Sequence, residues 1–249
     1  MIGPRYLVGG LGIVLVVAAL ALAATGLPGF GHYSHAYGRV VAQHSQPDRS
    51  VSNAVVMTAF DYRGFDTLGE EFILFISVVG VVVLLRRMRP ESEDDDAGDI
   101  EAEDVRSSTA ERWLGVAAVG PVAVLAVYVI VHGQLTPGGG FQGGVILMVA
   151  ALSLALGGEA ALLLRLRHSS TPIEMAEAAG AAAFALIGFG GLIAGGVFFL
   201  NFIDKGSRGL LTGGVIPLDN IAVGVEVAGA LLIVTSELFD QRLRRGGGT

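Results

Sequence analysis

Residues 132–144 read His-Gly-Gln-Leu-Thr-Pro-Gly-Gly-Gly-Phe-Gln-Gly-Gly and separate two long apolar runs of the chain. Five of the last seven positions are glycine, and a glycine inside a helix costs about 1 kcal/mol relative to alanine. Pro137 also removes a backbone donor. We therefore expect no ordinary helix here, but a compact turn or re-entrant segment at a membrane surface, where protein or water satisfies its backbone groups.

The composition is that of an integral membrane protein. Of the 249 residues, 52 % are hydrophobic and only 16 % are charged, and the mean hydropathy is +0.64. The chain has no cysteine, which excludes disulfides, thiolate metal sites and thiol catalysis within it. It also lacks the basic, aromatic-studded pattern of nucleic-acid-binding proteins. No nucleophile–base arrangement indicates an enzyme, and we expect neither a cofactor nor a resident metal.

Six apolar stretches are long enough to cross a bilayer as helices, which takes about 20 residues. They are Tyr6–Leu27, Glu70–Leu85, Trp113–Val131, Gly144–Leu164, Ala176–Leu200 and Leu218–Phe239. The expected fold class is therefore all-α and integral to the membrane, with six transmembrane helices. The first stretch has the alternative of a cleaved signal peptide, but its apolar core of about 18 residues exceeds the usual length, which favours an uncleaved helix.

An acidic linker divides the six spans into two and four. Residues 91–104 contain nine acidic residues and no basic one, and removing these nine charges from the formal net charge of −7 leaves +2. High charge with few apolar residues predicts disorder. We therefore expect a two-span region over residues 1–90, a disordered linker over 91–110 and a four-span region over 111–245.

The distribution of Lys and Arg predicts the orientation, because cytoplasmic loops carry an excess of these residues. The side that holds both termini would carry 11 of the 16 Lys and Arg residues, and the opposite side would carry five. Both termini are therefore expected in the cytoplasm, with the glycine-rich stretch on the outer side.

The segment between the first two spans, residues 28–69, would also lie outside. His32 and His35 have a spacing that suits a metal, but no third ligand is evident, so a solvated loop is favoured. Further along, Asp48 or Ser50 is expected to cap a short helix that runs through Ala59.

Asp66 and Glu70 stand at the start of the second span. Thr67-x-x-Glu70 matches a capping box, in which Glu70 would help to start the helix. The functional alternative is an acidic ledge at the outer surface that attracts cations. The spacing leaves both interpretations open.

Two further glutamates lie inside predicted spans, where ionisable groups are costly and usually functional. Glu226 is eight residues into the last span, about 12 Å from its start at 1.5 Å per residue. Its helical neighbours Ala222, Gly229 and Ala230 are small, so this face should pack against protein. Glu226 is then a proton or Na+ site, or a protonated carboxyl kept for packing. Glu159 lies nearer the cytoplasmic interface, where pairing with a nearby arginine is the structural alternative.

Gly188, Gly191 and Gly195 recur at helical spacing on the fifth span. A lipid-facing surface needs no such bare face, whereas close helix packing does. We expect another helix, from this chain or from a partner, to pack against it.

The glycine-rich stretch is also the basis of a resemblance. Thr-Pro-Gly-Gly-Gly-Phe-Gln-Gly-Gly at 136–144, followed by a long apolar helix, resembles the signature of the MnhB family, the B-type component of the Mrp-type multisubunit Na+/H+ antiporters, which has relatives in membrane-bound hydrogenases. That resemblance covers roughly residues 111–245. Residues 53–70, Asn-Ala-Val-Val-Met-Thr-Ala-Phe-Asp-Tyr-Arg-Gly-Phe-Asp-Thr-Leu-Gly-Glu, resemble the carboxy-terminal region of the large A-type component of Mrp antiporters and the small E-type component of the hydrogenases.

The resemblance implies a multi-pass subunit of a monovalent cation (Na+)/proton antiporter in the cell membrane, contributing to the cation pathway and to assembly. Its partners would be large proton-translocating subunits, small membrane subunits and the lipid bilayer. The positions to test by that likeness are Asp66, Glu70, Thr136, Pro137, Gly138, Phe141, Gln142 and Glu226. Glu159 is added from its place in a span, and the motif is completed by Gly139, Gly140, Gly143 and Gly144.

Two alternatives stay open: a purely structural subunit of such a complex, and the equivalent module of a membrane-bound hydrogenase-type oxidoreductase. The large subunits of the family use lysine-and-glutamate proton channels, whereas the only lysine here, Lys205, falls in a loop. This chain alone is therefore not expected to be a whole antiporter.

Overall fold

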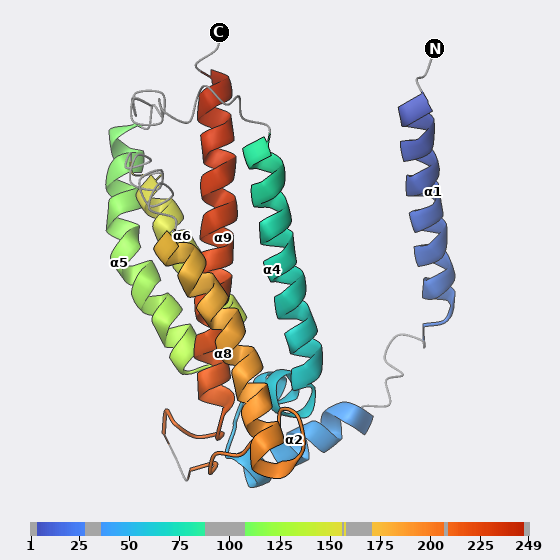
Figure 1. Cartoon of the computed structure of the whole chain (residues 1–249), viewed down its shortest axis with the longest axis vertical. Helices are drawn as coiled ribbons and strands as arrows, with labels where there is room; N and C mark the ends of the chain where they lie inside the picture. The colour runs from blue at the N-terminus through green and yellow to red at the C-terminus, as the bar shows by residue number, and fades with distance from the viewer. Residues whose placement is uncertain are drawn as a thin grey trace. The chain divides into compact units, whose positions relative to one another are not determined.

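The computed structural model describes residues 4–27, 36–87, 108–155, 157, 171–206 and 209–246, and its regular elements in these ranges are all helical (Figure 1). In chain order they are α1 (Pro4–Thr25), α2 (Ala36–Arg49), α3 (Ala54–Met57), the π-helical turn η1 (Thr58–Tyr62), α4 (Gly64–Arg87), α5 (Thr109–Val131), α6 (Gly140–Leu154), α8 (Thr171–Gly195) and α9 (Ile216–Gly246). The chain forms two compact units, Met1–Val40 and Val41–Thr249. The first contains α1, and the second is a helical bundle.

Four helices of the described ranges are long and apolar enough to cross a membrane. These are Gly64–Leu85 in α4, Thr109–Val131 in α5, Pro172–Gly195 in α8 and Ile216–Phe239 in α9. Gly10–Thr25 and Gly140–Leu154 are shorter apolar helices. The all-helical membrane class is thus confirmed. The orientation of the termini stays a prediction, and most of the predicted acidic linker, residues 91–107, lies outside the described residues.

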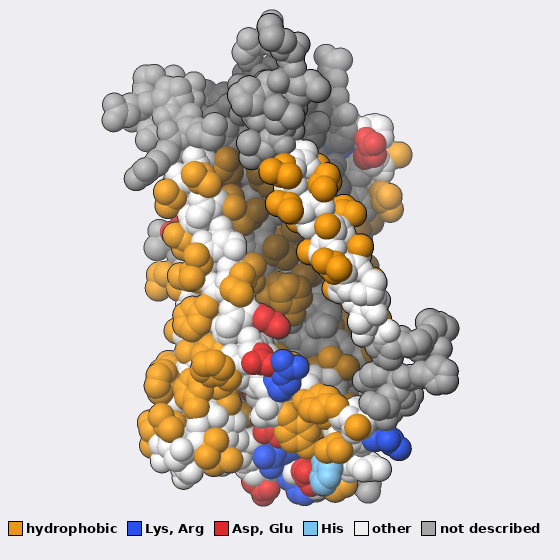
Figure 2. Space-filling model, turned by 90° about the vertical axis from the view of Figure 1, so that its right-hand side faces the viewer, with side chains coloured by type: hydrophobic (Ala, Val, Ile, Leu, Met, Phe, Trp, Pro, Cys, Tyr) orange, Lys and Arg blue, Asp and Glu red, His pale blue; other side chains and the backbone are white. Residues whose placement is uncertain are grey.

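Helix α9 is the centre of the bundle. It packs against α8, α6 and α4, and α5 reaches it mainly through α6 (Figure 1). In the apolar stretch of α9, 56 % of the residues are buried, whereas the other three long helices bury 11–22 %. The outer helices therefore keep broad apolar faces of the kind that lipid or partner helices cover. Figure 2 shows hydrophobic side chains along the helices. Among the described residues, charged side chains gather toward the end that holds η1 and the segment between α8 and α9, which we call the loop end.

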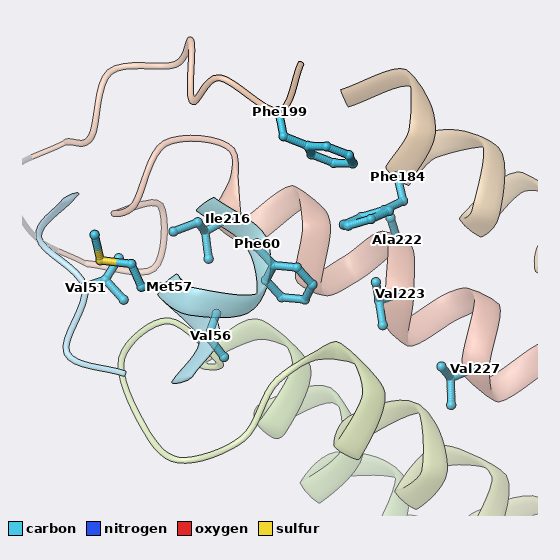
Figure 3. Close-up of a cluster of buried hydrophobic side chains, with 10 residues drawn as sticks. All are labelled: Val51, Val56, Met57, Phe60, Phe184, Phe199, Ile216, Ala222, Val223 and Val227. Carbon is cyan, nitrogen blue, oxygen red and sulfur yellow. The ribbon is translucent and has the colours of Figure 1, made fainter. Parts of the chain in front are cut away.

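The main apolar core lies at this loop end, where α3 and η1 pack between α8 and α9 (Figure 3). Phe184 of α8 is fully buried, with its ring 5.8 Å from that of Phe60 and 5.0 Å from that of Phe199. The cluster comprises Val51, Val56, Met57, Phe60, Phe184, Phe199, Ile216, Ala222, Val223 and Val227. It joins the segment before α4 to the last two helices, so residues from both sides of the acidic run share one core.

The segment between the first two predicted spans also contains α2, a helix that the sequence did not predict. The sequence predicted Asp48 or Ser50 as the cap of the next helix, and this prediction is wrong. Ser50 has a φ of +57° at the turn that follows α2, and α3 begins instead after Asn53. The side-chain oxygen of Asn53 accepts a hydrogen bond from the N–H of Val55 at 3.1 Å. His32 and His35 lie outside the described residues.

Helix α4 begins at Gly64, six residues earlier than the sequence predicted. The capping-box interpretation of Glu70 is therefore wrong: Thr67 lies within the helix, and its hydroxyl donates to the carbonyl of Ala59 at 2.7 Å. The early start follows from packing. A β-carbon at Gly64 would lie 2.8 Å from the ring of Phe199, so only glycine lets the chain approach this core before it turns into α4.

The glycine-rich stretch is shorter than predicted, because α6 begins at Gly140 rather than Gly144. Residues 132–139 form the turn, in which Gly138 and Gly139 have φ values of +151° and +147°. The glycines inside α6 are tolerated because neighbouring backbones press on them. A β-carbon at Gly144 would come within 2.8 Å of the Gly224 carbonyl oxygen. The loss of helix propensity is offset by this close approach.

The glycine face of α8 is covered by the loop that follows it, not by another helix. A β-carbon at Gly188 would lie 2.9 Å from the Phe199 ring, and one at Gly191 would lie 2.6 Å from the carbonyl oxygen of Leu200. Gly195 likewise faces the side chain of Leu200. The N–H of Phe199 donates to the Gly188 carbonyl at 3.1 Å. The prediction of a helical partner for this face was wrong, because the chain folds back on it at once.

Candidate functional site

The central feature of the bundle is a pair of carboxyl groups, Glu71 of α4 and Glu226 of α9. Glu71 is 4 % exposed and Glu226 is fully buried. The two carboxyl groups adjoin each other. Apart from this mutual contact, no described residue hydrogen-bonds either oxygen of Glu226 or Oε2 of Glu71. The pair is therefore a buried acidic site whose charge the described residues do not neutralise.

The position of the pair in the helices follows from helical spacing. Glu71 lies on the inward face of α4 with Thr67 and Val78, which are also buried. On α9, Ala222 and Ala230 lie one turn to either side of Glu226 and are buried with it. At 1.5 Å per residue, Glu226 is about 15 Å from the start of α9, close to the middle of the span Ile216–Phe239.

A third carboxyl, Glu177 of α8, extends the pair along α9. Glu177 is 4 % exposed and acts electrostatically on Glu226. Its position is fixed by two glycines. A β-carbon at Gly180 would lie 2.7 Å from the amide nitrogen of Glu226, and one at Gly229 would lie 3.0 Å from the β-carbon of Glu177. These two contacts place Glu177 one helical turn beyond Glu226, away from the loop end.

A separate buried acid, Asp219, lies in the first turn of α9 at the loop end. It is fully buried, and neither of its oxygens has a hydrogen-bond partner among the described residues. Asp61 acts electrostatically on it and is itself paired with Arg49 at 2.8 Å. Asp219 is seven residues from Glu226, about 10 Å along the helix, with apolar Val223 between them. It is thus a second site rather than part of the pair.

The glycine turn is held in place by amide side chains. The Nδ2 of Asn53 donates to the carbonyl oxygens of Gly133 at 2.8 Å and Thr136 at 3.1 Å. On the other side, the N–H of Gly140 donates to Oδ1 of Asn220 at 2.8 Å. Since Asn53 precedes α3 and Asn220 lies on α9, the turn links the segment before α4 to the central helix. This geometry indicates a structural role for the turn.

The residues singled out from the sequence fall in different places. Glu226 is buried against protein, as its small neighbours predicted. Glu70 and Asp66 are exposed, and Asp66 pairs with Arg63. Glu159 lies outside the described residues. In the glycine-rich motif, Pro137, Phe141 and Gln142 are exposed, Gly139, Gly140, Gly143 and Gly144 are buried, and Thr136 and Gly138 are intermediate.

Sequence reasoning missed Glu71, Glu177 and Asp219. Helix α4 is apolar around most of its circumference, so its pattern does not reveal that Glu71 rather than Glu70 faces inward. For Glu177 a signal existed: it lies one turn from Gly180 on a helix rich in small residues. Asp219 was hidden at a helix start, where an acidic residue is ordinary.

Two family models match the chain in succession. Residues 114–233 match MnhB, described as a domain related to the MnhB subunit of Na+/H+ antiporter, and residues 9–99 match MbhE, described as the E-type component of MBH.

Curated relatives include an uncharacterized protein of Methanocaldococcus jannaschii, 28 % identical over 200 residues that make up 73 % of this chain and 74 % of that protein. A probable K(+)/H(+) antiporter protein of Rhizobium meliloti, a combined A/B-type component, is 36 % identical over 118 residues, but the match covers 39 % of this chain and only 11 % of that much longer protein.

Solved structures with a similar fold include a chain of the membrane-bound sulfane sulfur reductase, an archaeal respiratory membrane complex. The similarity has a TM-score of 0.67 at 25 % identity and covers 94 % of this chain and 97 % of that one. A chain of the Mrp complex from Dietzia sp. gives a TM-score of 0.68 at 24 % identity, over 96 % of this chain and 26 % of that one.

Proposed function

We propose that this chain, which matches the MnhB-related family model over residues 114–233 and the MbhE model over residues 9–99, is a membrane subunit of a multisubunit monovalent cation/proton antiporter. In this role the chain contributes carboxyl groups to the ion pathway and surfaces to the assembly of the complex. Na+ is the metal cation that we propose, and the cell membrane is the location.

The observation that carries the proposal is the buried pair Glu71 and Glu226 at the middle of the bundle. Ionisable groups within a membrane are expensive and usually mark ion or proton pathways. A pair kept only for packing would be expected to have hydrogen-bond partners, since a buried polar group without one costs about 1–3 kcal/mol. Apart from Glu71, no described residue offers a hydrogen bond to either oxygen of Glu226.

Other subunits are required for transport in this proposal. The broad apolar faces of α4 and α5 remain exposed, with Phe72 and Ile76 on α4 and Trp113 and Val124 on α5. Lys205, the only lysine of the sequence, lies in a loop, where its Nζ donates to the carbonyl of Pro47 at 2.5 Å. It is thus not available for a lysine-based proton channel. Large proton-translocating subunits and small membrane subunits would supply the remainder.

The test is antiport by the whole complex in membrane vesicles. We expect Glu226→Gln and Glu71→Gln to leave the complex assembled and to abolish Na+-driven proton movement, because each removes a carboxylate while keeping the side-chain volume. Glu111→Gln is the matched control. Glu111 is exposed, and glutamine serves equally well at its position in the capping box with Ser108. Unchanged antiport in both pair variants would refute the pathway role, and loss of assembly alone would favour a purely structural subunit.

A second candidate is the equivalent module of a membrane-bound oxidoreductase. It is favoured by the fold similarity to the sulfane sulfur reductase chain, which covers 97 % of that chain. Purification of the complex through this chain distinguishes the two. Co-purifying subunits with iron–sulfur absorption would support the oxidoreductase, and their absence from an active antiporter would exclude it.

A further inference from the structure

We propose that the site formed by Glu71, Glu226 and Glu177 binds a proton and not a metal cation, so that the ion carried within this chain is H+. The inference rests on the proposed function, since it names the ion that the buried carboxyl groups handle. In this proposal Glu71 and Glu226 share one proton at the middle of the membrane, and Glu177 is the next group to accept it.

The first argument is electrostatic. The charged groups that act on Glu226 are Glu71 from α4 and Glu177 from α8, and those that act on Glu71 are Glu226 and its neighbour Glu70. All of them are acids. The described part of α6, which also packs against α9, has no titratable residue. Two adjoining carboxylates buried without a counter-charge repel each other, and sharing one proton removes that repulsion.

The second argument is the number of oxygen ligands. A dehydrated cation in a membrane protein is held by several oxygens, often carbonyls of an unwound helix. Here α4 and α9 are continuous through Glu71 and Glu226, and α8 is continuous through Glu177. Their carbonyls are therefore engaged in helical hydrogen bonds. The described residues also contain no group of three acidic or histidine side chains close enough to hold a metal ion. A proton between two carboxyl oxygens needs no further ligand.

The third argument is the dryness of the surroundings. The main apolar cluster contains Val223, on the loop side of Glu226, and Val227, the residue after it. Beyond Glu226, away from the loop end, lies a second cluster of Val78, Ala230 and Ile233. Leu74, less than a turn beyond Glu71 on α4, packs against both clusters. A hydrated Na+ does not fit between side chains packed in this way, whereas a proton adds almost no volume.

The arrangement also gives the proton a direction of travel. Glu177 lies one turn beyond Glu226, and Glu174 follows one turn further on α8 and acts electrostatically on Glu177. Each step is about 4.5 Å along a helix. Glu174 is only partly buried and lies in the first turn of α8. Glu226, Glu177 and Glu174 thus form a line from the middle of the bundle to the end opposite the glycine turn.

Infrared spectroscopy of the purified whole complex tests the proposal. In difference spectra at neutral pH we expect Glu226→Gln and Glu71→Gln each to lose one carbonyl band of a protonated carboxyl group that the wild type and Glu111→Gln both retain. Replacing Na+ by choline should leave this band unchanged in the wild type. That last measurement needs no variant, so it decides even where a substitution prevents assembly.

A metal-cation site would give the opposite results. If Na+ removes or shifts the band, or if bound radioactive Na+ falls by one equivalent per complex in Glu226→Gln, the proton assignment is wrong while the pathway role stands. If antiport survives both pair variants, the pathway role itself is wrong. In Glu177→Gln we expect the band to remain and antiport to fall at least tenfold, because the acceptor is lost and the pair is kept. Full activity in this variant would overturn the relay.

Discussion

Gly180 of α8 lies directly on Glu226 of α9, and a β-carbon at Gly180 would stand 2.7 Å from the amide nitrogen of Glu226. The contact is backbone against backbone, so neither helix has a side chain that can move aside. It sets the distance between α8 and α9 at the level of the carboxyl pair. The geometry of the acidic site therefore depends on a residue that bears no charge.

Gly180→Ala should separate α8 from α9 and destabilise the bundle by about 1–3 kcal/mol, the usual cost of overpacking. The measurement is the thermal unfolding of the purified complex in detergent. Gly120→Ala is the matched control: Gly120 is also inside a spanning helix, but a β-carbon there meets nothing within 4 Å. It should be neutral or slightly stabilising, because alanine favours a helix by about 1 kcal/mol over glycine. Equal stability of the two variants would contradict the packing argument.

Asn53 performs two tasks that two substitutions separate. Its Oδ1 caps α3, and its Nδ2 donates to the carbonyls of the glycine turn. Asn53→Asp keeps the cap but sets a second oxygen against those carbonyls. We expect it to cost at least as much as Asn53→Ala, about 1–3 kcal/mol. Protease sensitivity of the turn and thermal unfolding report the effect.

The control for Asn53 is Gln46→Ala, which removes a hydrogen bond to Ser52 at the surface and should change stability by less than about 0.5 kcal/mol. If Asn53→Asp behaved like this control while Asn53→Ala did not, only the cap would matter.

Arg49 neutralises Asp61 at the loop end, where Asp219 is the neighbouring acid. Removing one partner of a fully buried ion pair costs about 3–5 kcal/mol. Because Arg49 is 30 % exposed and Asp61 only 5 %, water replaces part of the lost interaction, and we expect about 1–3 kcal/mol for Arg49→Ala. Adding Asp61→Asn should restore most of the loss. A double-mutant cycle with no coupling between the two positions would show that the pair is not energetically significant.

The orientation predicted from loop charges is tested by reporter fusions. A reporter joined after Thr249 should behave as cytoplasmic, and a tag inserted at exposed Pro137 should be accessible from outside. Both fusions are measured in the same cells, by reporter activity and by labelling of intact cells with an impermeant reagent. The reverse pattern in both fusions would place the acidic site the other way round in the membrane.

Much of the architecture was predictable because membrane spans are recorded in the sequence as long apolar runs. The burial of Glu226 was also predictable, because Ala222 and Ala230 beside it are small residues, which are typical of helix–helix contacts in membranes. The glycine-rich stretch was recognisable as a turn, although Gly140–Gly144 proved helical. There the propensity cost is outweighed by contacts with α5 and α9, which no local pattern contains.

The sequence by itself determined that this chain is a bundle of apolar helices with a glycine-rich turn and a carboxyl group inside the membrane. Hydrophobicity and glycine content are local properties, and they suffice for that much. Only the tertiary structure decided that Glu71, and not its neighbour Glu70, meets Glu226, and that Glu177 joins them. Helices that are apolar on every side give no sign of which face is inward, so the partners of a buried charge are fixed by how the helices pack.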